Sequence, residues 1–315
     1  MNRWITNIAT HSIDFSYIEK DTIHKIYQIG DLNSCSSSFY LLLGDLHGNI
    51  KAAIVLAIRL QTLFKIPLKA VFQVGDFGFW PTGITAKLED PHYKKEDMLD
   101  FFELKKAREL DPPFSLGETK LEQFNASLYF IRGNHEDFVQ LNLLSNVVPS
   151  KVATKIYYLP DYFRGAIEDL NIAVLGGILI DLERGRGKKA KAQFKKAQQK
   201  VQTDLRCSNI LPLIQSILPN NKIDLLLTHS GLASRENQDG SRQLEAYLNQ
   251  SDVLLHVHGH HHRFAFDRIG SNTVSIGLRN LELAQNGRPI PGSFVLVNWQ
   301  DRTNYALYSD LTVKG

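Results

Sequence analysis

Short apolar runs that each end in a turn carrying Asp, Asn or His constrain the fold of this chain more than any other sequence feature. Apolar runs of about five residues between turn residues predict buried strands. The runs 39–43, 70–74 and 128–131 lead into glycine-containing turns that carry Asp45, Asp76 and Asn134. Three later runs end in a similar manner, at 171–175, 223–227 and 253–257.

Helix-forming segments separate these runs, beginning with the apolar stretch 50–60. Strands that alternate with helices predict an α/β fold, with a largely parallel sheet and helices on its outside. Because the carboxyl ends of parallel strands open into one crevice, the side chains in these turns are expected to meet there. The stretch 263–310 alternates short apolar runs with turn residues, which predicts antiparallel strands in a second sheet packed on the first.

The side chains expected at that crevice can ligate metal ions. They comprise carboxylates, one amide and imidazoles, a donor set that suits Mn²⁺, Fe, Zn²⁺ or Mg²⁺ rather than copper(I) or an iron–sulfur cluster. If one carboxylate bridges, the donors suffice for two ions, and two ions ~3.5–4 Å apart can clamp the attacking and leaving oxygens of a displacement at phosphorus. The candidates are Asp45, His47, Asp76, Asn134, His135, His229, His260 and His262.

Histidines are concentrated in one short segment, since five of the 11 in the chain lie between residues 256 and 262. A continuous strand would place His256, His258, His260 and His262 on one face, and His261 on the other. We expect His258 to orient a metal ligand from behind. His256 is expected to be a packed core histidine.

Five sequence blocks, in this order, resemble the metallophosphoesterase (calcineurin-like phosphoesterase) pattern. They are DLH at 45–47, GD at 75–76, GNHE at 133–136, His229 and GHHH at 259–262. Each block alone is common in proteins, but five in order, each after a predicted strand, are specific. The resemblance covers residues 39 to about 262, and it implies a four-layer αββα sandwich of two mixed β-sheets flanked by helices.

The resemblance also implies a role for each block residue in a two-ion phosphoester hydrolase, in which a hydroxide that bridges the ions attacks phosphorus. The ions would be Mn²⁺ in the first instance, with Fe, Zn²⁺ or Mg²⁺ as alternatives. His135 would face the substrate, as general acid or as a stabiliser of transition-state charge. Asp45, His47 and His262 would hold the first ion, Asn134, His229 and His260 the second, and Asp76 would bridge them.

The segment after Asp76 bears on the substrate. Protein phosphatases of this superfamily carry GDxVDRG there, whereas this chain has GDFGFW at 75–80, which argues against a phosphoprotein substrate. The GDFGFW form is similar to bacterial and phage members, as is the GGILID run at 176–181, in which Asp181 is expected to support the site. A small phosphorylated molecule or nucleotide is therefore the expected substrate. The aromatic residues at 77, 79 and 80 would stack a base or, more commonly, belong to the local core.

Residues 184–206 carry nine Lys or Arg and one acidic residue, Asp204. Apolar residues recur there at helical spacing, which predicts an amphipathic helix with a basic outer face. Such a helix is either an ordinary solvated helix or a polyanion-binding edge, and the second case would make the protein a nuclease or a nucleic-acid phosphatase or phosphodiesterase. Candidate phosphate clamps are Arg184, Arg186 and Arg132, the last of which could equally form a structural ion pair.

Composition excludes several other classes of protein. The 36 basic and 33 acidic residues are too balanced to indicate nucleic-acid binding by themselves. The two cysteines, Cys35 and Cys207, provide no disulfide framework and suggest no disulfide-linked partner. No apolar run approaches the ~20 residues of a membrane span, and no secretory signal is evident at the N-terminus. A cytoplasmic protein without a membrane partner is expected.

The expected organisation is one main domain with two additions. Residues 1–38 would form an extension packed on the core, with a strand at 24–29, and residues 39–315 the metallophosphoesterase domain. An insert at 81–126 would contain a charged helix near 93–110. A non-catalytic scaffold of the same fold is the remaining alternative, but such proteins usually lack ligands or the active-site histidine, and every block is complete here.

Overall fold

The computed structural model describes residues 26–27, 38–63, 66–81, 121–183, 188–216, 222–233, 240–282, 289–302 and 304–309. The helix expected near 93–110 and most of the 81–126 insert lie outside these residues, as do Arg184, Arg186 and Cys35. From the N-terminal extension, the structure describes Ser38 and β1 (Ile26–Tyr27), an edge strand that pairs in parallel with β16 (Asn304–Ser309).

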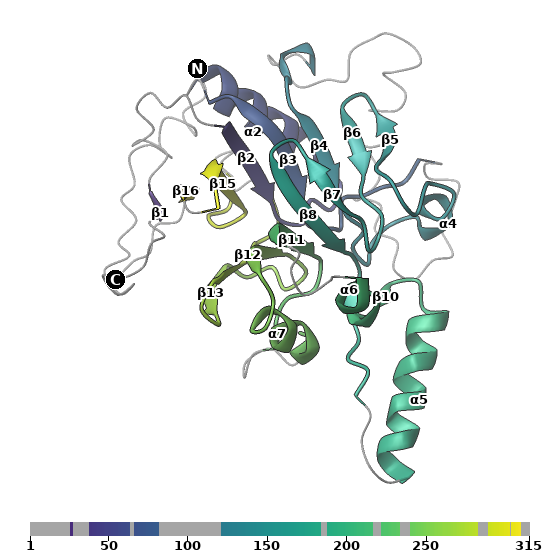
Figure 1. Ribbon diagram of the computed structural model, residues 1–315. Coiled ribbons are helices and arrows are strands. Elements are labelled where there is room, and N and C mark those ends of the chain that lie inside the picture. The colour runs from purple at the N-terminus through teal and green to yellow at the C-terminus, as the bar shows by residue number, and fades with distance from the viewer. Residues whose placement is uncertain are drawn as a thin grey trace.

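Two mixed sheets form the body of the protein (Figure 1). The first has eight strands, in the order β1, β16 (Asn304–Ser309), β15 (Phe294–Asp301), β2 (Ser38–Leu43), β3 (Leu68–Gln73), β4 (Ser127–Phe130), β6 (Ile156–Tyr158) and β5 (Ser150–Ala153). The second has six, in the order β13 (Ala265–Ile269), β14 (Thr273–Gly277), β12 (Val253–His258), β11 (Ile223–Thr228), β8 (Leu170–Leu175) and β7 (Arg164–Ile167). A small separate pair consists of β9 (Ile178–Leu179) and β10 (Cys207–Ser208).

Parallel strands form the centre of both sheets, with antiparallel strands beside them. In the first sheet β2, β3, β4 and β6 run parallel, and in the second β8, β11, β12 and β14 do. The expectation that the C-terminal stretch would form the second sheet was wrong. The parallel strands themselves divide between the two sheets, with β13 and β14 joining the second sheet and β15 and β16 the first.

Alternating side chains of the strands build the layers. Tyr40 and Phe72 of the first sheet and Val174 and Leu227 of the second point between the sheets, where they are completely buried in one apolar cluster. Strand residues of the opposite parity face outward and are covered by helices. Helix α2 (Ile50–Leu63) covers the outside of the first sheet, and α6 (Leu211–Ser216) and α7 (Arg242–Leu248) cover that of the second. The αββα sandwich implied by the sequence resemblance is confirmed.

Helix α5 (Lys188–Thr203) is the exception to this packing, because it projects away from the sandwich (Figure 1). None of its residues is buried. Four residues of the predicted apolar stripe are half-buried, Ala190, Phe194, Ala197 and Val201, while the helix's other residues are exposed. The fifth, Leu205, lies beyond the end of the helix and is exposed. Two short elements complete the described chain, the 3-10 helix η4 (Leu121–Gln123) and α4 (Phe138–Leu141). Among the described helices, none is both long enough and apolar enough to span a bilayer.

Candidate metal centre

The carboxyl ends of five parallel strands meet at one edge of the sandwich, three from the first sheet and two from the second. This is the crevice that the strand pattern predicts, although it lies between two sheets rather than on one. Each strand is followed within a few residues by a block side chain: Asp45 after β2, Asp76 after β3, Asn134 after β4, His229 after β11 and His260 after β12.

Asp45, His47 and His262 form one group that could hold an ion, with one donor atom from each residue within 4.8 Å of the others. Nε2 of His262 lies 2.9 Å from Oδ2 of Asp45 and 3.1 Å from Nε2 of His47. Two imidazole nitrogens at that separation fit side by side on one ion, given metal–nitrogen bonds of about 2.1 Å. The geometry of this group therefore suits a metal.

Asp76, His229 and His260 form the second group, also within 4.8 Å. The completely buried His229 has its Nδ1 2.9 Å from the carbonyl oxygen of Val74, which can only accept, so Nδ1 carries the proton and Nε2 presents its lone pair. That Nε2 lies 2.9 Å from Oδ1 of Asn134. Burial lowers the pKa of His260 to about 4, which keeps its imidazole in the neutral form that metals require.

The two carboxylate oxygens of Asp76 have different neighbours. Oδ1 accepts hydrogen bonds from the backbone N–H groups of Asn134, at 2.6 Å, and His135, at 2.8 Å. Oδ2 lies 3.8 Å from Nε2 of His47 and 3.6 Å from Nε2 of His229. Burial would raise the pKa of Asp76, but the surrounding His229, His47 and His135 lower it below its usual value. The carboxylate is therefore ionised, with one oxygen between the two groups.

Four of these residues have backbone conformations that L-amino acids seldom adopt. Their φ angles are 44° at His47, 51° at Asp76, 65° at His260 and 49° at His262. Left-handed conformations at residues other than glycine persist where the surrounding structure holds them, and they cluster at functional sites. These conformations also correct the expected alternation of histidines, because β12 ends at His258 and the strand geometry does not continue to His262.

Two glycines leave the space that the carboxylates occupy. A Cβ atom at Gly133 would overlap the carboxylate and backbone nitrogen of Asp76. One at Gly259 would overlap the carboxylate of Asp45, which accepts the backbone N–H of His260 at 3.0 Å. The glycines of these blocks thus have a steric role, since any larger residue would move a carboxylate out of its group.

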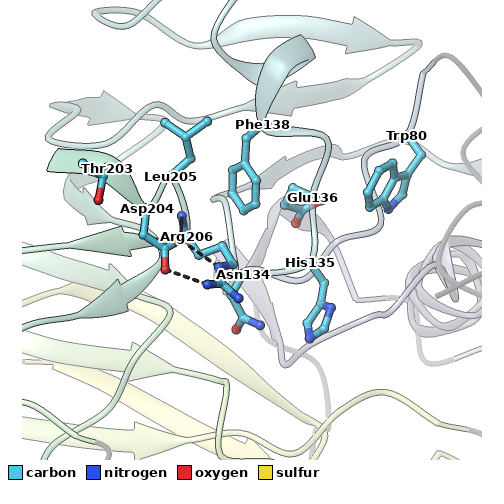
Figure 2. Close-up of a pocket in the computed structure, with 9 residues that line it drawn as sticks. All are labelled: Trp80, Asn134, His135, Glu136, Phe138, Thr203, Asp204, Leu205 and Arg206. Atoms are coloured by element: carbon cyan, nitrogen blue, oxygen red, sulfur yellow. Dashed lines mark hydrogen bonds and ion pairs between the residues drawn. The ribbon is translucent and has the colours of Figure 1, made fainter. Parts of the chain in front are cut away.

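His135 belongs to neither group, but its ring lies edge-on to that of His47, with 5.4 Å between the centroids. It also lines a cavity of about 370 Å³ that adjoins the centre (Figure 2). The opposite wall comes from the turn that follows α5. The lining residues are Trp80, Asn134, His135, Glu136, Phe138, Thr203, Asp204, Leu205 and Arg206.

Glu136 braces the centre, a role that sequence analysis missed. Its buried carboxylate accepts backbone N–H groups from Phe77 and Phe79, each at 2.7 Å, and thereby ties the GNHE turn to the segment that follows Asp76. Burial, with the nearby charge of Asp76, raises the pKa of Glu136 to about 8. Only the position of Glu136 within the GNHE block could have indicated such a role.

The aromatic residues after Asp76 belong mainly to the core. Phe77 and Phe79 are buried, and Phe77 stacks on Phe130 with ring centroids 4.2 Å apart. Trp80 is also buried, but it contributes to the cavity wall as well. Of the two roles considered for these aromatic residues, packing in the local core rather than stacking on a base applies to Phe77 and Phe79.

Arg132 forms a structural ion pair, which the sequence left open as an alternative to a phosphate clamp. Its Nε donates to Oδ2 of Asp161 at 2.7 Å, and its other N–H groups bind the carbonyl oxygens of Leu205 and Cys207 and the hydroxyl of Ser208. Arg132 therefore fastens the GNHE turn to the chain that leaves α5. These contacts engage its guanidinium with protein groups rather than leaving it as a phosphate clamp.

The other residues that the sequence analysis singled out, Asp181, His258 and His256, make contacts of their own. Asp181 accepts the hydroxyl of Ser241 and the backbone N–H of Arg242, so it holds the start of α7. His258 is 6% exposed and stacks on His256 with 5.3 Å between the ring centroids. His256 is the packed strand histidine that was expected. Its Nε2 lies 2.9 Å from the hydroxyl oxygen of Thr228, and its Nδ1 lies 2.8 Å from that of Ser275.

Comparison with known proteins identifies a family whose sequence model matches this chain. A sequence model of the calcineurin-like phosphoesterases matches residues 24–264. A search of curated protein sequences found no significant match. Among solved structures, TT1561 of Thermus thermophilus is 10% identical, with a TM-score of 0.45, and the match covers 88% of this chain and 100% of that one.

Two other structures are similar at a comparable level. A putative 5′-nucleotidase from Staphylococcus aureus is 14% identical, with a TM-score of 0.38, and the match covers 87% of this chain and 53% of that one. The sulfate thiohydrolase SoxB from Thermus thermophilus is 12% identical, with a TM-score of 0.40, and coverage of 89% and 57%. The chain thus spans about half the length of these two proteins, and such distant similarities do not indicate its substrate.

Proposed function

The chain belongs to the calcineurin-like phosphoesterase family and is a metal-dependent phosphoester hydrolase, and we propose that it cleaves a small phosphorylated molecule or nucleotide at a two-ion centre. The observation that carries the two-ion proposal is the position of Asp76. One of its carboxylate oxygens faces His47 in one group and His229 in the other. The other oxygen is fixed by two backbone N–H groups, which leaves the first free to bridge.

The two groups would each hold one divalent ion. Carboxylate, amide and imidazole donors suit Mn²⁺, which we propose as the ion, and also Fe, Zn²⁺ and Mg²⁺. When bound, such ions supply positive charge that activates water and stabilises the phosphoryl oxygens. The proposed ligands are Asp45, His47 and His262 for the first ion, Asn134, His229 and His260 for the second, and Asp76 for both.

His135 is the proposed catalytic residue. Its backbone N–H is anchored on Asp76, which places the imidazole between the ligand groups and the cavity. From there the side chain would donate a proton to the leaving oxygen as the phosphoester bond breaks. A positioned general acid typically contributes ~10²–10⁴ in rate.

The bridging role of Asp76 is tested by the variant Asp76→Asn. Asparagine keeps the shape of the side chain but removes the charge that both groups share, so both sites should weaken together. Elemental analysis of the purified variant should give well under two metals per chain. Two bound metals per chain in Asp76→Asn would contradict the bridge.

The reaction is tested with mono- and bis-(p-nitrophenyl) phosphate, each assayed with Mn²⁺, Fe²⁺, Zn²⁺ and Mg²⁺. Release of p-nitrophenol from one of the two distinguishes a monoesterase from a diesterase. Loss of activity with a chelator, and its return with one of the ions, is expected. An absence of turnover with every ion would favour the non-catalytic scaffold.

A nuclease or nucleic-acid phosphatase is the second candidate, and helix α5 is the observation that favours it. The helix carries six lysines and no acidic residue, and it projects from the body (Figure 1). The end of the helix contributes Thr203 to the cavity wall, so a polyanion lying along it would reach the proposed centre. Hydrolysis of RNA or DNA in preference to mononucleotides would support this candidate over the first.

A further inference from the structure

The cavity beside His135 extends from the candidate metal centre to side chains that belong to neither ligand group. Asn134 and His135 form one wall, next to the ligand groups, and Phe138, Leu205 and Arg206 contribute elsewhere to the lining (Figure 2). If the phosphoryl group of a substrate lay at the metal centre, the rest of the substrate would occupy this cavity. Its volume of about 370 Å³ lies near the lower end of the ~300–1,000 Å³ typical of small-molecule sites.

Two apolar side chains in the lining come from two different elements and lie near each other (Figure 2). Phe138 begins α4, and the guanidinium carbon of Arg132 lies 5.9 Å from its ring centroid, which holds the ring in position. Leu205 follows α5 and is 50% exposed, so its side chain is accessible to a ligand in the cavity. The carbonyl oxygen of Leu205 is bound by Arg132, so the same arginine positions both side chains.

A charged pair supplies the polar part of the same wall. Nε and Nη2 of Arg206 donate to the two carboxylate oxygens of Asp204, at 2.7 and 2.6 Å. The hydrogen bonds from Arg206 lower the pKa of Asp204 to about 2, so both partners are charged at neutral pH. Donor and acceptor groups therefore lie next to each other beside the apolar side chains (Figure 2).

Resting on the proposed phosphoesterase function, we propose that this cavity binds the leaving group of the substrate and selects a nucleoside, whose planar base lies between Phe138 and Leu205. A base has two apolar faces, which suit the phenyl ring and the isobutyl group, and a polar edge, which suits the Asp204–Arg206 pair. A polyol would leave the two apolar side chains without a match. An acyl chain would bury the charged pair against hydrocarbon, which is costly.

The test compares adenosine 5′-monophosphate with ribose 5-phosphate, and the methyl diester of each in case the enzyme cleaves only diesters. Within each pair the scissile ester is the same and only the base differs. The measured quantity is the ratio of kcat/KM for the two substrates. The wild-type protein should prefer the substrate with the base at least tenfold. Phe138→Ala or Leu205→Ala should lower the ratio about tenfold, which is the usual size of the contribution of base stacking on a side chain.

Leu143→Ala is the matched control, because Leu143 is a 74% exposed leucine that does not line the cavity. This variant should keep the wild-type ratio. A wild-type ratio near one, or an unchanged ratio in both Phe138→Ala and Leu205→Ala, would overturn the proposal while leaving the phosphoesterase function intact.

A binding measurement separates the two proposals if no ester is hydrolysed. Adenosine, which has no phosphate, is titrated into the protein by calorimetry. Binding to the wild type that Leu205→Asp weakens at least tenfold would support the nucleoside site even though the proposed hydrolysis had failed. Absence of adenosine binding, or equal binding by wild type and Leu205→Asp, would overturn it.

Discussion

Individual residues at the candidate centre are held by their backbone conformations and by backbone hydrogen bonds. The four block residues with left-handed φ angles have side chains that point into the two groups, and hydrogen bonds from the backbone fix the carboxylates. The sequence indicated these residues through their chemistry, their order along the chain and the resemblance of their blocks to a known family. It could not identify Glu136 as a brace, because its role depends on a fold that brings two backbone N–H groups to a buried carboxylate.

The steric role of Gly259 gives a prediction at this scale. Gly259→Ala should displace the carboxylate of Asp45, because the added Cβ atom would overlap it and would lie 2.9 Å from Cγ2 of Val74. We expect the loss of about one metal per chain by elemental analysis, with every ligand residue still present. Gly165→Ala is the control, since its Cβ would meet only the end of the Phe163 side chain, at 3.1 Å. Full metal content in Gly259→Ala would show that the centre tolerates the displacement.

His135→Ala tests the proposed general acid. The variant should keep both metals and lose ~10²–10⁴ in kcat, the usual contribution of a positioned proton donor. The loss should be smaller for a p-nitrophenyl ester than for an alkyl ester, because p-nitrophenolate leaves with little protonation. Loss of a metal would make His135 a ligand, and equal losses on both esters would indicate charge stabilisation instead of proton donation.

Among the elements, long apolar strands were predicted within two residues of their observed ends. The predicted helix at 50–60 corresponds to α2, and the basic segment contains α5. Five strands, β5, β6, β7, β9 and β10, were not predicted. They are two to four residues long, and β5 and β7 contain exposed positions and little hydrophobic alternation. Pairing with neighbouring strands rather than local sequence therefore specifies them.

The lysines of helix α5 can be tested for nucleic-acid binding. If the helix binds a nucleic acid, replacing Lys188, Lys189 and Lys191 with Glu should weaken RNA or DNA binding. The slope of log K against log salt concentration should become shallower by about 0.9 for each phosphate that the helix no longer neutralises.

A control for α5 has the same change in charge elsewhere. Lys69, Lys151 and Lys222 are exposed on the sandwich, and their replacement with Glu should leave the slope as it is if α5 alone binds. Equal effects of the two triple variants would indicate a general charge effect, and no binding by the wild type would favour an ordinary solvated helix.

The whole molecule depends on how its two sheets are joined, which the sequence did not reveal. Every parallel strand has a similar apolar pattern, so local sequence does not specify which sheet it enters, and long-range contacts decide. The inter-sheet core joins the sheets along their length. At the amino-terminal ends of β11 and β12, an ion-pair network adds a second link between them.

Arg302 forms that link, and its removal is the prediction for the whole molecule. It follows β15 of the first sheet, and its guanidinium contacts Asp224 at 2.8 Å and Asp252 at 2.6 Å, at the start of two strands of the second. Asp224 is only 3% exposed, so Arg302→Ala would leave a buried carboxylate without its cation. We expect the free energy of unfolding to fall by about 3 kcal/mol in a denaturant titration.

The structure offers a control and a rescue for the Arg302 variant. Arg268→Ala removes an arginine whose hydrogen bond to the carbonyl oxygen of Ser271 is exposed to solvent, and should cost less than about 0.5 kcal/mol. Adding Asp224→Asn to Arg302→Ala removes the unpaired charge but keeps an acceptor for the backbone N–H of Asn171, which Asp224 binds at 2.8 Å. The double variant should therefore be more stable than Arg302→Ala alone. If it were less stable by the full cost of a second substitution, the loss in Arg302→Ala would come from packing rather than from the buried charge.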